Sequence, residues 1–283
     1  MSQRNGLGFD IGWGLCALVV CLAAGVGVSA QEDAPEFWEK TNETWFETVA
    51  EGGTVSVDNP HGNIWVRFGG YEDQVEIIAT IQRLEPDLPR LTVQREPGTG
   101  RLDVRVRVER KAGDASPEPE RRDRIDLVLF VPIGRRVELS TLDDAIAVKG
   151  LKGDLQVRTV KGDVTLRKIE GAVDILSERG KTTAILGTGV TDGAQRFESV
   201  TGDIEVTLYE DAVHDLRLAT SGRISTDFSL EIEYRRFEEP GKHGKAVLGG
   251  GGPELSMTSK RGAIALLRQQ KFFKHDEDEK DPS

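Results

Sequence analysis

The chain repeats one short phrase, and this repeat constrains the fold more than any other feature of the sequence. Each copy consists of a glycine, one polar residue and an apolar–polar–apolar triplet. The clear copies span residues 153–157, 162–166, 202–206 and 222–226, with a weaker copy at 180–184 and outlying copies at 62–66 and 262–266. A period near 20 residues, with two or more short strands in each repeat, is typical of a solenoid. The sequence therefore predicts an all-β fold, a single-stranded β-helix or β-solenoid with short strands and glycine turns.

The glycines mark the corners of the predicted coil. From Gly162 they recur after 18, 22 and 20 residues, at Gly180, Gly202 and Gly222. Asp144 stands 18 residues before Gly162, and we expect it to replace glycine at that corner because Asp tolerates a left-handed turn. A second series of turn glycines comprises Gly153, Gly171 and either Gly189 or Gly193. Glycine at such positions supplies positive φ or admits close backbone approach.

The apolar residues of the triplets form the predicted core. The inward-facing set is Leu155, Val157, Val164, Leu166, Val173, Ile175, Ile204, Val206, Leu208, Leu216, Leu218, Ile224 and Phe228. Burying one such side chain contributes roughly 1.5–3 kcal/mol, and ordering each backbone residue costs about 1–2 kcal/mol. No single rung is stable alone, so stability has to come from stacking. Residues 254–258 and 262–267 are expected to form the last rung.

Alternating strands also precede the repeats. Residues 91–93 and 101–109 predict a hairpin across a turn at 97–100, and 125–131 predicts a further strand. In the second hairpin strand, Arg101, Arg105 and Arg107 share one face. This row could bind anions, but Asp103 and Glu109 lie in it as well. A solvated strand face of mixed charge is therefore the simpler interpretation.

The termini differ from the repeat region. Residues 1–30 resemble an export signal, with Arg4, an apolar run and small residues before Gln31; an uncleaved anchor is the alternative. Residues 31–50 are expected to be a linker and N-terminal cap, 51–268 the β-strand-repeat domain, and 269–283 an acidic disordered tail. Residues 112–122, rich in proline and charge, predict a flexible loop.

Two aromatic residues occur in the predicted cap. Trp38 and Trp45 stand seven residues apart, and a short helix or strand carrying them would close one end of the coil. An aromatic binding platform is the alternative interpretation of the pair. Capping is preferred because aromatic side chains near a domain edge usually contribute buried area.

Composition restricts the function. The formal net charge is −11, opposite to the basic balance typical of nucleic-acid-binding proteins. Both cysteines, Cys16 and Cys21, lie in the signal segment, so the mature chain can form no disulfide or thiolate site. His61, His214, His243 and His275 show no metal-ligand spacing. We therefore expect no cofactor, no metal and no catalytic residue.

Aspartates in the repeats suggest two further hypotheses. Asp154, Asp163 and Asp203 each follow a corner glycine, and a stack of their carboxylates could hold Ca²⁺. The period does not match the calcium-binding β-roll repeat, and turn aspartates usually hydrogen-bond their own backbone. Because β-helices also host polysaccharide lyases and hydrolases, Asp143, Asp144, Asp163 and Asp203 are candidate carboxylates for an enzyme, although fold analogy is a weak warrant.

The chain resembles a family of bacterial exported domains of unknown function with β-strand repeats, known as putative adhesins. The resemblance covers about residues 50–268 and rests on 55–66, 125–132, the serial Gly-Asp phrases, 249–255 and 262–264. The loop at 112–122, the longer interval from Gly180 to Gly202, and the acidic tail depart from the pattern. The resemblance implies a β-strand-repeat architecture and transfers no catalytic residue.

These observations favour a non-enzymatic exported protein of the periplasm or cell surface. Its repeat surface would serve adhesion, or bind a protein or glycan partner. A polysaccharide-acting enzyme and an envelope-stress accessory protein are the alternatives. Neither nucleic acid nor, beyond an uncleaved N-terminal segment, a membrane is an expected partner.

Overall fold

The computed structural model describes residues 39–83, 90–109, 123–186 and 193–269. The chain divides into Met1–Glu36 and Phe37–Ser283, and all described residues lie in the second of these units. They form strands and turns with no helix, which confirms the all-β prediction. Accordingly, this part of the chain contains no helix that could cross a membrane. The predicted signal segment, the loop at 112–122 and the tail beyond residue 269 lie outside the described residues.

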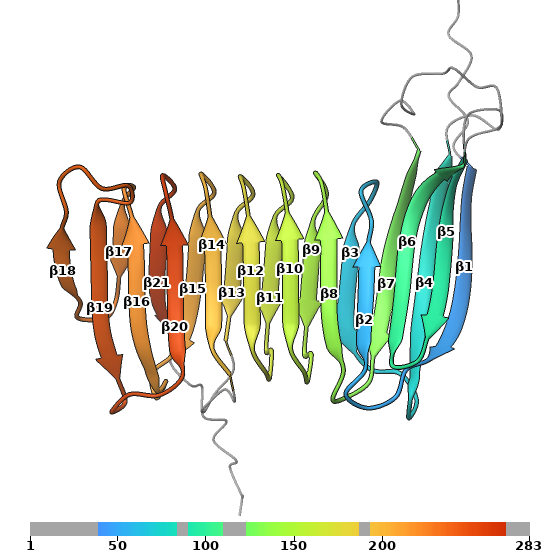
Figure 1. Cartoon of the computed structure of the whole chain (residues 1–283), viewed down its shortest axis with the longest axis horizontal. Coiled ribbons are helices and arrows are strands. Elements are labelled where there is room, and N and C mark those ends of the chain that lie inside the picture. Colours follow the sequence, from blue (N-terminus) through green and yellow to red (C-terminus); the bar gives the residue numbers. More distant parts are fainter. Residues whose placement is uncertain (1–38, 84–89, 110–122, 187–192, 270–283) are drawn as a thin grey trace, which may run out of the picture. The chain divides into compact units, whose positions relative to one another are not determined.

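The described strands make two large, mostly parallel sheets (Figure 1). The ten-stranded sheet contains, in spatial order, β1 (Glu39–Thr48), β4 (Gln74–Arg83), β7 (Arg124–Val131), β3 (Ile64–Phe68), β9 (Ile146–Lys149), β11 (Val164–Arg167), β13 (Thr182–Ile185), β15 (Ile204–Tyr209), β21 (Ile264–Gln269) and β17 (Ile224–Thr226). The eleven-stranded sheet contains β18 (Glu231–Tyr234), β19 (Lys242–Leu248), β16 (His214–Thr220), β20 (Glu254–Ser259), β14 (Gln195–Ser199), β12 (Val173–Ser177), β10 (Leu155–Thr159), β8 (Arg136–Thr141), β2 (Thr54–Asp58), β6 (Arg101–Glu109) and β5 (Arg90–Gly98).

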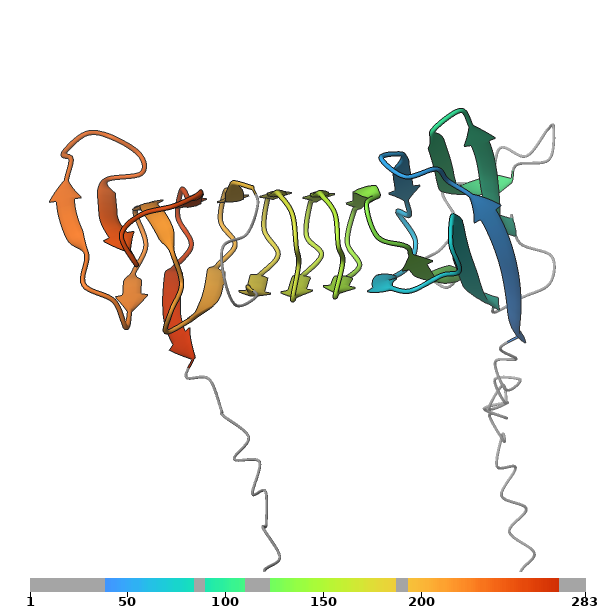
Figure 2. The ribbon, with the colours of Figure 1, turned by 90° about the horizontal axis from the view of Figure 1, so that it is seen from below.

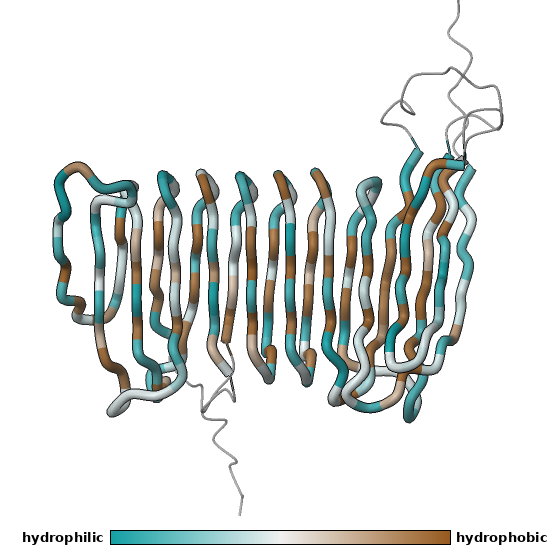
Figure 3. The backbone as a smooth tube through the Cα atoms, in the orientation of Figure 1, coloured by the Kyte–Doolittle hydropathy of each residue, from teal (hydrophilic) through white to brown (hydrophobic). Residues whose placement is uncertain are grey.

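Between β8 and β15 the chain passes back and forth between the two sheets, as Figure 2 shows. We call two consecutive strands, one in each sheet, a rung. Neighbouring rungs pair in parallel and in register; for example, Val164 of β11 pairs with Ile146 of β9 and with Thr182 of β13. The apolar–polar–apolar triplets alternate between the inside and the outside, visible as alternating colours along the strands in Figure 3. The repeated phrase thus produces one rung after another.

Toward the C-terminus the rungs do not stack in chain order, and the expected last rung is not at the end. β20 pairs with β14 on one side and β16 on the other, while β21 lies between β15 and β17. In Figure 1 the late strands β20 and β21 therefore interrupt the colour sequence. Along the chain, the β16 and β17 rung is followed by the antiparallel strands β18 and β19. The last rung, β20 and β21, then lies between the β14 and β15 rung and the β16 and β17 rung.

In the N-terminal part, too, the spatial order of the strands differs from their order along the chain. β2 lies between β6 and β8, and β3 lies between β7 and β9. The rung of β2 and β3 is thus followed in the chain by β4, β5 and β6, which lie on one side of it, before β8 and β9 continue on the other side. β5 and β6 form the expected hairpin.

One continuous hydrophobic cluster fills the space between the sheets. The predicted inward-facing set is buried, except that Ile224 is only partly buried and packs against the cluster. The period-two pattern therefore identified the core correctly.

An aromatic ring with a cation over it lies near each end of the ten-stranded sheet. Trp45 lies on a strand, β1, and not on a helix; it is partly buried against the core, and the guanidinium of Arg95 lies 4.6 Å from its ring centre. Trp38 lies outside the described residues. At the other end Arg268 lies 4.7 Å from the ring centre of Phe228.

Candidate functional site

A column of buried hydroxyls and glycines runs through one corner of the stack. The strands of the eleven-stranded sheet that contribute to this column each end in Ser or Thr, and a glycine usually follows three residues later. The hydroxyl residues are Thr141, Thr159, Ser177, Ser199, Ser259 and Thr220, all buried. Thr159 Oγ1 accepts a hydrogen bond from Gly162 N at 2.9 Å, and Ser199 Oγ accepts one from Gly202 N at 2.8 Å. This column was not predicted from the sequence, although Ser/Thr-x-x-Gly opens four of the repeated phrases.

The corner glycines are required by lack of room. A Cβ on Gly162 would lie 1.8 Å from the carbonyl oxygen of Asp144, and one on Gly180 would lie 2.0 Å from that of Gly162. Neither glycine has a positive φ. The expectation that Asp144 adopts a left-handed turn is wrong, because its φ is not positive either. Close approach of successive rungs, and not backbone handedness, selects glycine here.

The second series of turn glycines belongs to another corner. Gly171 has a φ of 134°, and a Cβ there would lie 2.6 Å from the carbonyl of Gly153. Gly193 continues this corner, because a Cβ on it would lie 2.7 Å from Cβ of Ala172. Gly189 lies outside the described residues.

The aspartates that follow the glycines join neighbouring rungs. Asp154 Oδ1 accepts from Ala172 N at 3.0 Å, Asp163 Oδ1 from Lys181 N at 2.8 Å, and Asp203 Oδ1 from Ala263 N at 2.7 Å. The expectation that they bond their own local backbone is therefore corrected: each one caps an amide of the next rung. Parallel in-register stacking brings the amide of the neighbouring rung within hydrogen-bond distance of each carboxylate.

These carboxylates do not gather into one site. Lys181 occupies the rung between Asp163 and Asp203, and its Nζ lies 2.8 Å from Glu205. The hydrogen bond that Lys181 donates to Glu205, with further attraction from Glu205, Asp203 and Asp163, raises the pKa of Lys181 despite partial desolvation. Among the described residues no three His, Cys, Asp or Glu side chains form a group that could hold a metal ion. The stacked arrangement proposed for Ca²⁺ is thus interrupted by an ammonium group.

The remaining candidate carboxylates and histidines also have structural partners. Asp143 lies 3.2 Å from Lys161 Nζ, and Asp144 lies 3.3 Å from Arg124. The nitrogens His214 Nδ1 and His243 Nε2 lie 3.1 and 3.0 Å from the backbone carbonyls of Pro253 and Pro240. His61 donates its backbone N–H to Asn59 Oδ1 at 3.2 Å, and His275 lies outside the described residues.

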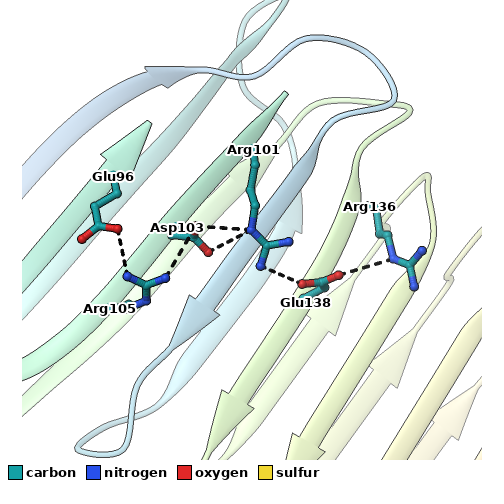
Figure 4. A network of polar contacts seen from close by, with 6 residues as sticks. All are labelled: Glu96, Arg101, Asp103, Arg105, Arg136 and Glu138. Carbon is teal, nitrogen blue, oxygen red and sulfur yellow. Dashed lines mark hydrogen bonds and ion pairs between the residues drawn. The ribbon is translucent and has the colours of Figure 1, made fainter. Parts of the chain in front are cut away.

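On the outer face of the eleven-stranded sheet, the arginine row forms a network of opposite charges (Figure 4). Arg105 pairs with Glu96 at 2.9 Å and with Asp103 at 3.6 Å. Arg101 pairs with Asp103 at 3.1 Å and with Glu138 at 3.0 Å, and Glu138 also contacts Arg136 at 3.7 Å. This is the mixed-charge face expected from the sequence, because its cations are neutralised by neighbours.

The outer face of the ten-stranded sheet is different. Arg67, Lys149 and Arg167 occupy one register row on the adjacent strands β3, β9 and β11. All three are exposed, and none forms an ion pair with another described residue. We call these three residues the basic row. It was not predicted from the sequence because its members are far apart in the chain, although a Lys or Arg directly after an apolar–polar–apolar triplet was an available signal.

A groove of about 750 Å³ lies over β16, β18 and β19, at one end of the eleven-stranded sheet. Its charged lining residues alternate in sign: Asp215, Arg217, Glu231 and Lys245. This groove presents no convergent set of groups that would select one ligand.

No protein-family model matches the sequence, and no curated protein matches it. Solved structures similar to this chain include a putative cell adhesion protein from Clostridium sporogenes ATCC 15579, with 11% identity, a TM-score of 0.44, and coverage of 81% of this chain and 100% of the other. A putative adhesin from Bacteroides fragilis NCTC 9343 has 10% identity, a TM-score of 0.26, and coverage of 81% and 97%. A putative adhesin from Parabacteroides merdae ATCC 43184 has 9% identity, a TM-score of 0.28, and coverage of 80% and 96%. All three proteins carry names that refer to adhesion.

Proposed function

We propose that this protein is a non-enzymatic, exported β-solenoid scaffold of the cell envelope, whose long outer faces bind a partner protein, a glycan or a surface. One observation carries the proposal. The side chains that could perform acid–base chemistry, such as Asp163 and Asp203, instead cap backbone amides of adjacent rungs. A carboxylate that holds two rungs together cannot leave that position without loosening the stack.

The arrangement of the sheets supports a binding role. Successive rungs place equivalent outward residues in rows, so a face of the stack presents side chains at regular intervals. Repeat proteins use such extended surfaces to bind extended ligands. The Gly and Ser/Thr corners provide a rigid support for these rows.

A pull-down experiment tests the proposal. The purified protein is immobilised and incubated with an envelope extract at several ionic strengths, and retained proteins and polysaccharides are identified. We expect reproducible retention of a protein or polymer that a matched immobilised control protein does not retain. Retention of nothing specific at any ionic strength would contradict a binding scaffold.

A separate assay tests the alternative hypothesis that the protein is an enzyme acting on polysaccharides. The protein is incubated with a panel of acidic and neutral polysaccharides, and new chain ends are measured. We expect no turnover. Turnover by the unmodified protein that is lost in Asp163→Asn, while the fold is retained, would replace the scaffold by an enzyme.

Export is tested with residues 1–30 alone. They are fused to a reporter enzyme that is active only outside the cytoplasm. Activity of the fusion, and none without the segment, is the expected result. An inactive fusion that is stably produced would contradict export through this segment.

A further inference from the structure

We propose that the outer face of the ten-stranded sheet over β3, β9 and β11 binds an extended acidic polysaccharide, whose anionic groups pair with Arg67, Lys149 and Arg167. The inference rests on the proposed scaffold function and specifies its ligand. It follows from four features of this face: the register of the cations, their lack of ion-pair partners among the described residues, a strained lysine beside them, and the row that contains Trp65.

Register places the cations at regular intervals. Arg67 pairs with Lys149 and Lys149 with Arg167 in the parallel ladders. Neighbouring strands lie about 4.8 Å apart, so the positive groups recur at this step along a line that crosses the strands. A linear polyanion lying across the strands could contact all three, because its charged groups also recur along a line.

The described residues do not neutralise the basic row. None of its members has an ion-pair partner within the described ranges, while the arginines of Figure 4 are joined to Glu96, Asp103 and Glu138. The chain as a whole carries a net charge of −11, so acidic side chains are plentiful. Three adjacent cations that pair with no acid of the described ranges are complementary to an external anion.

Lys168 adds a fourth cation at some conformational cost. It directly follows Arg167, as Gly150 follows Lys149, and Gly150 N donates to Arg167 O at 2.9 Å. Gly150 has a φ of 72°, and Lys168 has a φ of 54°, a left-handed conformation that disfavours every residue with a side chain. Strain of this kind often accompanies function, and here it leaves an exposed lysine beside the basic row.

The neighbouring register row provides a contact surface for sugar rings. Trp65, Ala147 and Thr165 pair across the same three strands, and all three are partly exposed. The indole of Trp65 offers a large apolar area with a polar edge, and the C–H face of a pyranose ring packs on such a surface. The side chains of Ala147 and Thr165 are small, so they project only a short way from the sheet surface beside Trp65.

The charge distribution along these strands favours a narrow polymer over a flat anionic membrane as the ligand. Asp163 lies two residues before Thr165 and is exposed, so one acidic group lies beside the Trp65 row on the side opposite the cations. An anionic bilayer would bring this carboxylate against its own charge.

The test compares two triple variants of the full chain. Arg67→Ala/Lys149→Ala/Arg167→Ala removes the basic row, and Arg101→Ala/Arg105→Ala/Arg136→Ala removes three cations from the opposite face. Both lower the net charge equally, and both replace exposed or partly exposed side chains, so the fold is expected to persist. Circular dichroism and urea midpoints verify that it does.

Binding is measured by calorimetry with size-defined oligogalacturonides and heparin oligosaccharides, with dextran as the neutral comparison. We expect the unmodified protein to bind at least one acidic probe and not dextran. The basic-row variant should lose at least tenfold in affinity and show a smaller salt dependence, while the control variant keeps its affinity. Trp65→Ala should weaken binding several-fold without changing the salt dependence.

Three results would overturn the inference: no binding of either acidic probe at low salt, equal loss in both triple variants, or tighter binding of single-stranded DNA or anionic vesicles than of the polysaccharides. These results are separable from failure of the scaffold function. If the pull-down retains a partner that the basic-row variant also retains, the scaffold stands and the assignment of this face fails.

Discussion

At Gly162 the next rung leaves no space for a side chain. A Cβ at this position would lie 1.8 Å from the Asp144 carbonyl oxygen, which is a collision with backbone and not with a flexible side chain. We expect Gly162→Val to lower the free energy of unfolding by about 3 kcal/mol or more. Thr165→Val, on the outer face of the same strand, should change it by less than about 0.5 kcal/mol. Urea unfolding midpoints check the pair, and similar midpoints would contradict the close approach of the two rungs.

The buried hydroxyl column makes a second prediction for single residues. Ser199→Ala leaves the N–H of Gly202 without its acceptor in a buried corner, and this should cost about 1–3 kcal/mol. Ser199→Thr keeps the hydroxyl, and Thr already occupies the equivalent positions 159 and 220. It should therefore retain most of the stability in thermal or urea unfolding. Equal destabilisation by both variants would show that the volume of the side chain at position 199, and not its hydrogen bond, determines the loss of stability.

At this scale much could be predicted from the sequence, because burial follows the period of two. Leu155, Val157 and Ile204 are buried as expected. The role of Asp144 and the partners of Asp163 could not be predicted, since both depend on how closely another rung approaches. The distance between neighbouring rungs depends on how the rungs stack, and no single copy of the repeated phrase determines it.

Among the elements, β20 and β21 come last in the described chain but lie inside the stack. Each is hydrogen-bonded on both edges, whereas β18 pairs with β19 alone among the described strands and is exposed along its length. Native-state hydrogen exchange should therefore show β20 and β21 as well protected as β14 and β15, and β18 much less protected. Fast exchange throughout residues 254–269 would contradict the inserted position of these strands.

The turn between β18 and β19 should respond to acid. The hydrogen bond and charge of Arg261 lower the pKa of Glu239, so the stability that this pair contributes is present above the ordinary glutamate pKa of about 4.3 and is lost as pH falls through the lowered value. NMR titration of the Glu239 carboxyl should give a pKa below this ordinary value, and Arg261→Gln should raise it. An unchanged pKa in the variant would mean that the ion pair is not formed in solution.

Strand existence could be predicted, but strand order could not. The repeated phrases at 202–206, 222–226 and 262–266 are so alike that local pattern does not specify which two are neighbours. The structure places Gly262 between Gly202 and Gly222. This order arises from the excursion through β18 and β19, which is a tertiary effect.

For the molecule as a whole, the functional proposals depend on the rows of outward residues, and the rows depend on parallel in-register stacking. The basic row exists only because β3 lies between β7 and β9, although β4, β5 and β6 separate β3 from both along the chain. The repeated phrase predicted a repeat protein, and the net charge predicted that it does not bind nucleic acid. Neither could predict which outward residues meet, because Arg67 and Lys149 are brought together only by this insertion.

Disulfide formation between engineered cysteines tests this stacking most directly. In a chain with Cys16 and Cys21 replaced by serine, Arg67→Cys/Lys149→Cys places the thiols on directly paired residues, at a Cα separation of about 4.8 Å that a disulfide can span. Phe130→Cys/Lys149→Cys places them two strands apart, at about 9.6 Å, which is too far. Under mild oxidation we predict an intramolecular disulfide in the first protein and none in the second. The reverse result would contradict the strand order and, with it, the basic row.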